Sequence, residues 1–251
     1  MSLRARLLFA VWLLAGLAIW VLLVVDAHEQ FRLYYSNVVQ TASALVCGLV
    51  CLGTRDVFPR SSPLRRAWGL IGVGVIAWGV GSAIFAGYPV LHGGEETPYP
   101  YYSDLAFLMT SPLIALGLLA FKRSTGLVAP LWGISLALVV LAVSGYWCFV
   151  ANASGLAEGP ASALTAIGYI VFDPVLVAVT VLVASSFRGG AIGNAWWLVL
   201  AGVGLYFCAN QLYSYLSFLE AYTTGSWIDV GWVFGFGLIA LAGLTTRNLM
   251  R

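Results

Sequence analysis

The sequence predicts an all-α integral membrane protein in which eight transmembrane helices form four like-oriented helical hairpin repeats. Of the 251 residues, 61% are hydrophobic and 9% are charged, whereas about a quarter of the residues in a soluble domain are charged. Eight apolar segments are long enough to cross a bilayer, and their residues do not alternate as those of a strand would. A polar motif also recurs near one end of every second segment.

Each apolar segment is taken as one span. The first follows Arg4 and Arg6 and covers residues 7–25, longer than the roughly 7 to 15 apolar residues of a signal peptide, so we expect it to stay in the mature chain. The spans are expected at residues 7–25, 31–53, 67–91, 102–121, 127–150, 162–187, 194–218 and 227–246. They pair into hairpins at about 7–53, 67–121, 127–187 and 194–246, which form one membrane domain over residues 1–251 without a soluble domain.

The recurring polar motif lies near the start of the second, fourth and eighth spans. Residues 34–37 read Tyr-Tyr-Ser-Asn, residues 101–104 read Tyr-Tyr-Ser-Asp, and residues 227–229 read Trp-Ile-Asp. A weaker copy, Phe-Asp, stands at residues 172–173 in the sixth span. The pattern indicates that one hairpin unit has been repeated four times and has diverged.

The distance from the motif to the next basic residue is nearly constant. Asn37, Asp104 and Asp229 each precede a basic residue by 18 positions, and Asp173 precedes Arg188 by 15. At about 1.5 Å per helical residue, 18 residues span roughly 27 Å, close to the roughly 30 Å thickness of a bilayer's hydrocarbon. We therefore expect each unit to contain a helix with a polar residue near one membrane face and a cation at the other.

The loops separate into a basic set and an acidic set. Eleven of the twelve basic residues lie near the termini or in the loops at 54–66, 122–126 and 188–193, and the other loops hold Arg32 alone. Because basic loops remain in the cytoplasm, we expect both termini to be cytoplasmic. The basic set comprises Arg4, Arg6, Arg55, Arg60, Arg65, Arg66, Lys122, Arg123, Arg188, Arg247 and Arg251, and the acidic loops hold Asp26, Glu29, Glu95, Glu96, Glu158 and Glu220.

Asp173 is the candidate functional residue that lies deepest in the predicted bundle. It is expected roughly 8 Å or more below the outer boundary, where a carboxylate is costly and faces the bundle interior or a water-filled cavity. Pro174 follows it, and a proline inside a helix removes one backbone donor and favours a kink. A kink beside a carboxylate is typical of a pocket wall.

Five further polar side chains are expected in the same outer half of the bundle: Asp104, Asn210, Gln211, Tyr213 and Asp229. If the hairpins pack around a common axis, these groups form a small polar cavity open to the outside. Two interpretations stay open. The side chains either hydrogen-bond one another and set the order of the helices, at about 1 kcal/mol per contact, or they bind a ligand or a partner protein.

Small residues at a spacing of four indicate where helices approach closely. Gly79, Ala83 and Gly87 follow this spacing in the third span, and Gly231 and Gly235 follow it in the eighth. We expect these five residues to pack against neighbouring helices.

Several kinds of chemistry are disfavoured. The only lysine, Lys122, lies at a cytoplasmic helix end, which excludes an intramembrane Schiff base. His28 and His92, the only histidines, lie in outer loops, so paired histidines cannot hold a haem between helices. A net charge of +2 gives no reason to expect nucleic acid. We expect no catalytic residue and no metal site, although one outer site combining a histidine with a loop glutamate stays open, and the cofactor is unspecified.

Residues 98–104 (PYPYYSD), followed by Pro112, resemble a known membrane region, and the similarity continues through Asp173 and Asp229. The chain is similar over about residues 66–247 to the multi-pass N-terminal membrane region of bacterial GGDEF/EAL cyclic-di-GMP signalling proteins and histidine kinases. The resemblance implies an input module in the bacterial cytoplasmic membrane. Because residue 251 follows the last span directly, we expect either a separated sensor or a bundle that acts alone or as a subunit.

Three functions are consistent with these observations. The first is a non-catalytic, sensor-like module that binds a ligand or partner in the outer half of the bundle and acts on another membrane protein or a downstream signalling protein. The second is an accessory subunit of a larger membrane complex, with helix, lipid or pigment contacts. The third is a small-solute transporter, which internal repeats suggest, although the like orientation of the hairpins argues against it.

Overall fold

The structure is a computed structural model that describes residues 3–126, 128–186 and 191–250. These residues form helices and connecting loops, without a strand among them. The helices are α1 (Leu3–Val24), α2 (Glu29–Arg55), α3 (Pro63–Leu91), α4 (Tyr102–Thr125), α5 (Leu131–Asn152), the short 3₁₀ helix η1 (Ser154–Leu156), α6 (Pro160–Ser185), α7 (Ala191–Phe218) and α8 (Asp229–Leu249).

In the described part of the chain, eight helices are long and apolar enough to cross a membrane, which confirms an all-α, multi-pass membrane protein. Their positions follow the predicted spans, and several extend beyond them at one end. The predicted position 187 and the basic residues Arg188 and Arg251 lie outside the described residues, as does position 127.

Local sequence explains where several helices begin and end. Ser62 caps α3, because its Oγ accepts a hydrogen bond of 3.2 Å from the backbone N–H of Leu64. Proline at position 160 opens α6, where its missing N–H needs no helical partner. Gly126 ends α4 with a φ of 63°, a left-handed conformation that glycine adopts without steric penalty.

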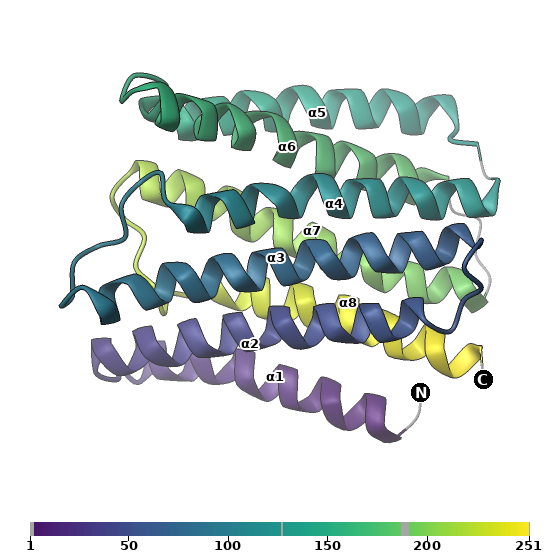
Figure 1. The fold of residues 1–251 in the computed structure, drawn as a ribbon, viewed down its shortest axis with the longest axis horizontal. Helices are drawn as coiled ribbons and strands as arrows, with labels where there is room; N and C mark the ends of the chain where they lie inside the picture. Colours follow the sequence, from purple (N-terminus) through teal and green to yellow (C-terminus); the bar gives the residue numbers. More distant parts are fainter. Residues whose placement is uncertain (1–2, 127, 187–190, 251) are drawn as a thin grey trace.

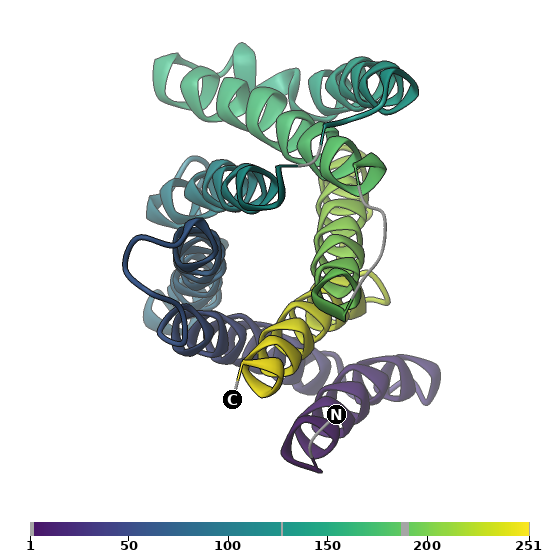
Figure 2. The same cartoon turned by 90° about the vertical axis from the view of Figure 1, so that its right-hand side faces the viewer.

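Six helices form a closed ring. Each of α2, α3, α4, α6, α7 and α8 contacts the next in that order, and α8 returns to contact α2 (Figure 2). The remaining two lie outside the ring, α1 against α8 and α2, and α5 against α6 and α7. The chain therefore places α4 beside α6, which is not its neighbour in sequence.

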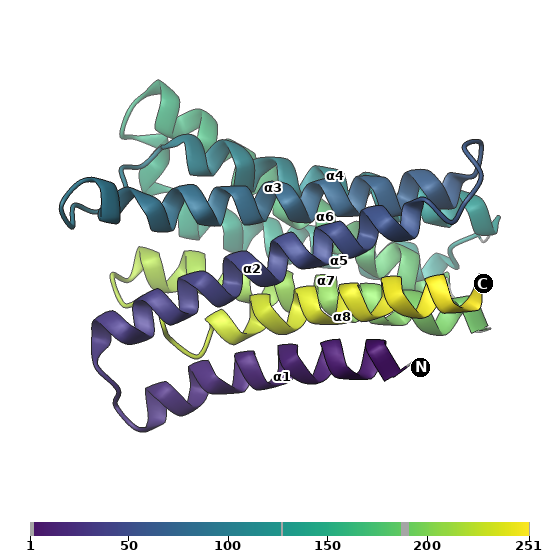
Figure 3. The same ribbon diagram turned by 60° about the horizontal axis from the view of Figure 1, so that its bottom comes forward.

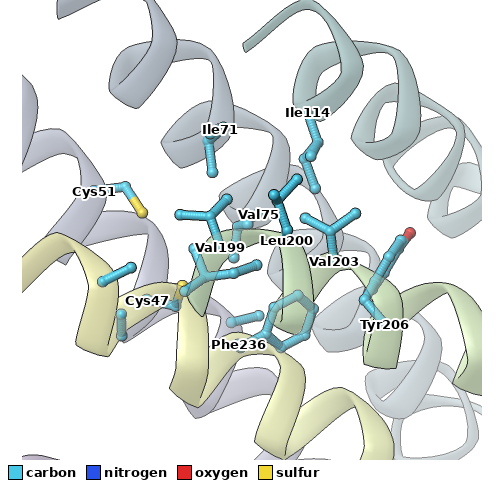
Figure 4. Close-up of a cluster of buried hydrophobic side chains, with 14 of the residues drawn as sticks. Cys47, Cys51, Ile71, Val75, Ile114, Val199, Leu200, Val203, Tyr206 and Phe236 are labelled. Carbon is cyan, nitrogen blue, oxygen red and sulfur yellow. The ribbon is translucent and has the colours of Figure 1, made fainter. Parts of the chain in front are cut away.

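The interior of the ring is packed with large side chains. Figure 4 shows aliphatic and aromatic residues from α3, α4, α7 and α8 directed toward one another, with Cys47 and Cys51 of α2 beside them. Next to them, the rings of Phe121 and Trp196 stack with centroids 3.5 Å apart, and Trp68 lies 5.1 Å from Trp196. All three side chains are almost completely buried. This interior is the hydrophobic core that holds the six helices together.

The two ends of the bundle differ in charge. Helix α1 begins and α8 ends at the same end of the molecule, where the loops after α2 and α4 also lie (Figures 1 and 3). We call this the basic end, because it carries Arg55, Arg60, Arg65, Arg66, Lys122, Arg123 and Arg247. We call the opposite end, formed by residues 25–28, 92–101, 153–159 and 219–228, the acidic end.

Three of the five small residues singled out from the sequence lie at helix contacts. A Cβ atom on Gly79 would lie 2.9 Å from Leu45 Cδ2, and one on Gly231 would lie 2.9 Å from Ala209 Cβ. A Cβ on Gly235 would lie 2.8 Å from the carbonyl oxygen of Gly202.

The other two small residues lie away from such contacts. Ala83 is exposed, and a Cβ on Gly87 would meet no heavy atom within 4 Å. The spacing of four therefore continues along α3 beyond the close contact at Gly79.

Candidate functional site

Three aspartates carry the polar contacts in the half of the bundle near the acidic end. Asp229 is the first residue of α8 and Asp104 is the third of α4, so both lie near that end. Asp173 lies 13 residues after the start of α6, which places it about 20 Å along the helix at 1.5 Å per residue. It is therefore close to the middle of its 26-residue helix, deeper than the minimum expected from the sequence.

Asp229 is completely buried and well supplied with donors. Its Oδ2 accepts hydrogen bonds from Ser36 Oγ (2.6 Å) and from the backbone N–H of Gly225 (2.7 Å), and its Oδ1 accepts one from Tyr222 O–H (2.8 Å). Gln40 Nε2 in turn donates to Ser36 Oγ at 2.9 Å. Asp229 thus ties the start of α8 to α2 and to the loop after α7.

Asp104 makes a similar contact between α4 and α6. Its Oδ2 accepts from the backbone N–H of Tyr101 at 2.9 Å, which caps the helix, and its Oδ1 accepts from Tyr169 O–H at 2.9 Å. Burial, followed by the charges of Asp104 and Glu158, raises the pKa of the loop residue Tyr99 to about 12. Tyr99 is therefore a neutral phenol at physiological pH.

Asp173 has the poorest set of donors. Its Oδ1 accepts from Ser111 Oγ at 2.5 Å, whereas the bond from Asn210 Nδ2 to its Oδ2 is long, at 3.4 Å. Trp232 Nε1 donates to Asn210 Oδ1 at 2.8 Å, which directs the NH₂ group of Asn210 toward the carboxylate. The contacts connect four helices, α4, α6, α7 and α8. An ionised carboxylate can accept about four hydrogen bonds, so two partners leave Asp173 incompletely solvated.

A second polar pair lies next to Asn210 in α7. Cys148 Sγ of α5 donates to Gln211 Oε1 at 3.0 Å, and both residues are buried. Gln211 Nε2 is buried without a hydrogen-bond partner. An unpaired buried amide costs about 1–3 kcal/mol, so this part of the bundle has polar capacity that the protein itself does not use.

None of the three aspartates pairs with a cation among the described residues. The ion pairs in this part of the chain join Arg32 to Asp26, and Arg55 and Arg65 to Asp56, all at the surface. A buried carboxylate inside a membrane protein normally pairs with another group or faces water. Asp173, with 6% of its surface exposed and only two donors, is the carboxylate that departs most from this rule.

The structure distributes the six sequence-predicted site residues over several contacts. Asp173 and Asn210 meet directly, while Gln211 bonds to α5. Tyr213 packs edge-on against the rings of Tyr222 and Trp232. Asp104 and Asp229 lie at two separate helix contacts, with α6 and α2 respectively.

Sequence reasoning missed Ser36, Ser111, Tyr169 and Trp232. Ser36 belongs to the recurring motif, but the motif's spacing to the next basic residue indicates its neighbour Asn37. Ser111 had a usable signal, because it precedes Pro112 just as Asp173 precedes Pro174. Nothing in the spacing of Tyr169 or Trp232 indicated their partners.

Two cavities lie away from the aspartates. One, of about 310 Å³, is lined by Leu119, Lys122, Arg123 and Gly126 at the basic end. The other, of about 120 Å³, lies between α1, α7 and α8 and is lined mainly by apolar residues such as Phe9 and Phe234. Neither cavity is lined by Asp173 or Ser111, and both of these residues are buried.

No family model, no curated protein and no solved structure matches this chain. The candidate site is therefore defined by its geometry alone.

Proposed function

We propose that the protein is a non-catalytic membrane module that binds a ligand or a partner in the half of the bundle near the acidic end and passes the change to a neighbouring protein. The observation that carries this proposal is Asp173, a carboxylate near the middle of a span that has two donors and no cationic partner among the described residues. A group this costly to bury commonly marks a functional site.

The helices around Asp173 are suited to a change of packing. Pro112 follows Ser111 in α4, and Pro174 follows Asp173 in α6. Each proline interrupts the helical hydrogen bonds next to the Ser111–Asp173 contact. A helix with such an interruption can bend at small cost. A ligand that contacts Asp173 more favourably in one arrangement of α6 than in another would shift the population toward that arrangement.

The proposal includes the membrane orientation and the repeats. The acidic end would face the outside of a bacterial cytoplasmic membrane, with both termini in the cytoplasm, since the basic residues collect at the end where the chain begins and ends. The contact of Asp104 with Tyr169 of α6 parallels that of Asp229 with Ser36 of α2, which supports a common origin for the four hairpins. The resemblance to sensor regions of signalling proteins fits this role.

A role as an accessory subunit is the second candidate. Helices α1 and α5 lie outside the ring, and only 17% and 22% of their central residues are buried. Their exposed faces carry large apolar side chains, including Trp20 and Trp132. Such faces can contact lipid or the helices of another membrane protein.

Native mass spectrometry of the protein purified in mild detergent tests the proposed function. We expect a bound small molecule or second chain on the wild type, lost in Asp173→Asn and retained in Asp56→Asn, a surface control at the basic end. Identical spectra for the wild type and Asp173→Asn would contradict a site at Asp173. A stoichiometric second chain bound equally by all three proteins would favour the accessory subunit.

A further inference from the structure

We infer that Asp173 and Ser111 are ligands of a small monovalent cation, such as Na⁺, bound between α4 and α6 together with main-chain carbonyl oxygens released by Pro112 and Pro174. This inference rests on the proposed function, because it names the ligand class of the same site. It is drawn from two matching pairs, Ser-Pro in α4 and Asp-Pro in α6, which the hydrogen bond between Ser111 and Asp173 joins.

The two prolines release carbonyl groups at the level of this contact. Proline has no N–H, so Pro112 cannot donate to the carbonyl of Leu108, and Pro174 cannot donate to that of Ile170. Each of these carbonyls belongs to a residue three positions before Ser111 or Asp173, which places both members of each pair on one helix face. Since Ser111 and Asp173 bond to each other, we expect the released carbonyls on the facing sides of α4 and α6.

Close packing brings these sides together. A Cβ atom on Gly168 of α6 would lie 2.8 Å from Leu108 Cδ2 of α4. The glycine therefore leaves room for the Leu108 side chain between α4 and α6, near the Ser111–Asp173 contact. A carboxylate oxygen, a hydroxyl oxygen and two carbonyl oxygens from two helices can then surround one small ion.

The charge of the site matches one positive charge. An ionised Asp173, whose Oδ1 accepts from Ser111 Oγ, carries one negative charge, which one monovalent cation would neutralise. Asn210 engages the other carboxylate oxygen, Oδ2, and leaves Oδ1 to bridge toward Ser111. A cation bound to Oδ1 and Ser111 Oγ would replace this hydrogen bond and neutralise the buried carboxylate.

The donor set favours a small monovalent ion over other ligands. Among the described residues, no three His, Cys, Asp or Glu side chains gather in one place, so a transition metal has no suitable set. A divalent ion would be only half neutralised by Asp173. Released backbone carbonyls are also common Na⁺ ligands in membrane proteins.

Binding of ²²Na⁺ to the purified chain in lipid nanodiscs tests the inference, with thermal unfolding measured in parallel. Titration of NaCl against choline chloride at constant ionic strength should show one saturable site per chain. A Na⁺ concentration roughly 100 times the dissociation constant should raise the melting temperature by about 5 °C. We expect Asp173→Asn to abolish binding and Ser111→Ala to weaken it about tenfold, as loss of one neutral ligand would.

Controls separate this result from general effects on folding. Ser144→Ala removes another buried hydroxyl, one that bonds within its own helix α5, and should leave Na⁺ binding unchanged. If Asp173→Asn does not fold, the Na⁺ affinity of Ser111→Ala can still be compared with that of Ser144→Ala, and only the former should be weakened. Absence of Na⁺ binding, or equal stabilisation by choline and Na⁺, would overturn the inference. Stabilisation by acid alone would identify a proton as the ligand and overturn it too.

The two proposals fail in distinguishable ways. If no Na⁺ binds while native mass spectrometry still detects a ligand that Asp173→Asn loses, the ion assignment is wrong and the proposed function stands. If Na⁺ binds but does not change the binding of any neighbouring protein, the ion site exists and the proposed transmission to a neighbour is wrong.

Discussion

Replacing Asp229 with alanine should cause the largest loss of stability among the three aspartates. The substitution leaves three buried or partly buried donors without an acceptor: Ser36 Oγ, Tyr222 O–H and the N–H of Gly225. Hydrogen bonds between helices in membrane proteins contribute about 0.6 kcal/mol on average and up to about 1.7 kcal/mol. Three such bonds give an expected destabilisation of roughly 2–5 kcal/mol.

Asparagine at the same position provides the matched comparison. Its Oδ1 can still accept from Ser36 and Gly225, and its NH₂ group can donate to the Tyr222 oxygen, so Asp229→Asn should lose about 1 kcal/mol or less. Ser36→Ala combined with Asp229→Ala in a double-mutant cycle isolates one bond, whose coupling should be about 0.6–1.7 kcal/mol.

Reversible unfolding in mixed micelles, followed by circular dichroism, measures these differences. If Asp229→Ala and Asp229→Asn both lie within about 0.5 kcal/mol of the wild type, as for an ordinary surface site, Asp229 does not join α8 to α2. Strict additivity of Ser36→Ala and Asp229→Ala would exclude their contact even if each variant were destabilised.

Three further predictions concern packing and titration. Gly202→Ala should lower stability by about 1–3 kcal/mol in the same unfolding assay, because a Cβ there would lie 2.6 Å from a carbonyl oxygen of α8. Gly204→Ala, where a Cβ would have no atom within 4 Å, should be neutral or stabilising. Equal melting temperatures for the two variants would contradict the close α7–α8 contact. Trp196→Ala should lower the free energy of unfolding by about 3–5 kcal/mol, because it removes a buried ring that stacks on Phe121. Trp132 is 63% exposed, so Trp132→Ala should cost less than about 0.5 kcal/mol. A larger loss for Trp132→Ala than for Trp196→Ala would place the core elsewhere. Burial raises the pKa of Tyr99 to about 12. The difference between the absorbance spectra of the wild type and Tyr99→Phe should therefore lack a phenolate band at pH 10 and show one near pH 12. Stability should fall as the pH rises from about 10 to 12, since Tyr99 loses its proton at lower pH in the unfolded chain than in the folded one.

Segment length predicted more of the fold than helix periodicity could. An apolar run such as residues 67–91 needs only its length to be assigned as a span, and α3 follows it closely. The hydrophobic effect does not distinguish a lipid-facing side chain from a core side chain, so the spans are apolar all round. The sequence therefore did not indicate that α4 would lie beside α6 or that α1 and α5 would lie outside the ring.

The sequence did not reveal the partners of the candidate residues either, because it does not show which helix faces meet. Asp173 was recognisable because a carboxylate is rare inside a span, and its partners Ser111 and Asn210 come from helices whose facing sides only packing decides. The recurring motif marks the starts of α4 and α8, but it lies inside α2 and near the middle of α6. It also did not give the contact residue in α2, since Ser36 contacts Asp229 of α8 and Asn37, one position on, is rotated by about 100° around the helix.

Solid-state NMR of the chain in bilayers, with ¹³C-labelled aspartate, tests the central claim most directly. The chain has five aspartates, so the Asp173 side-chain carboxyl signal can be assigned by subtracting the spectrum of Asp173→Asn. We predict an ionised carboxyl that lies close to the labelled Nδ2 of Asn210 and whose signal moves when Na⁺ replaces choline. A carboxyl that contacts lipid acyl chains and does not respond to any cation would contradict the account.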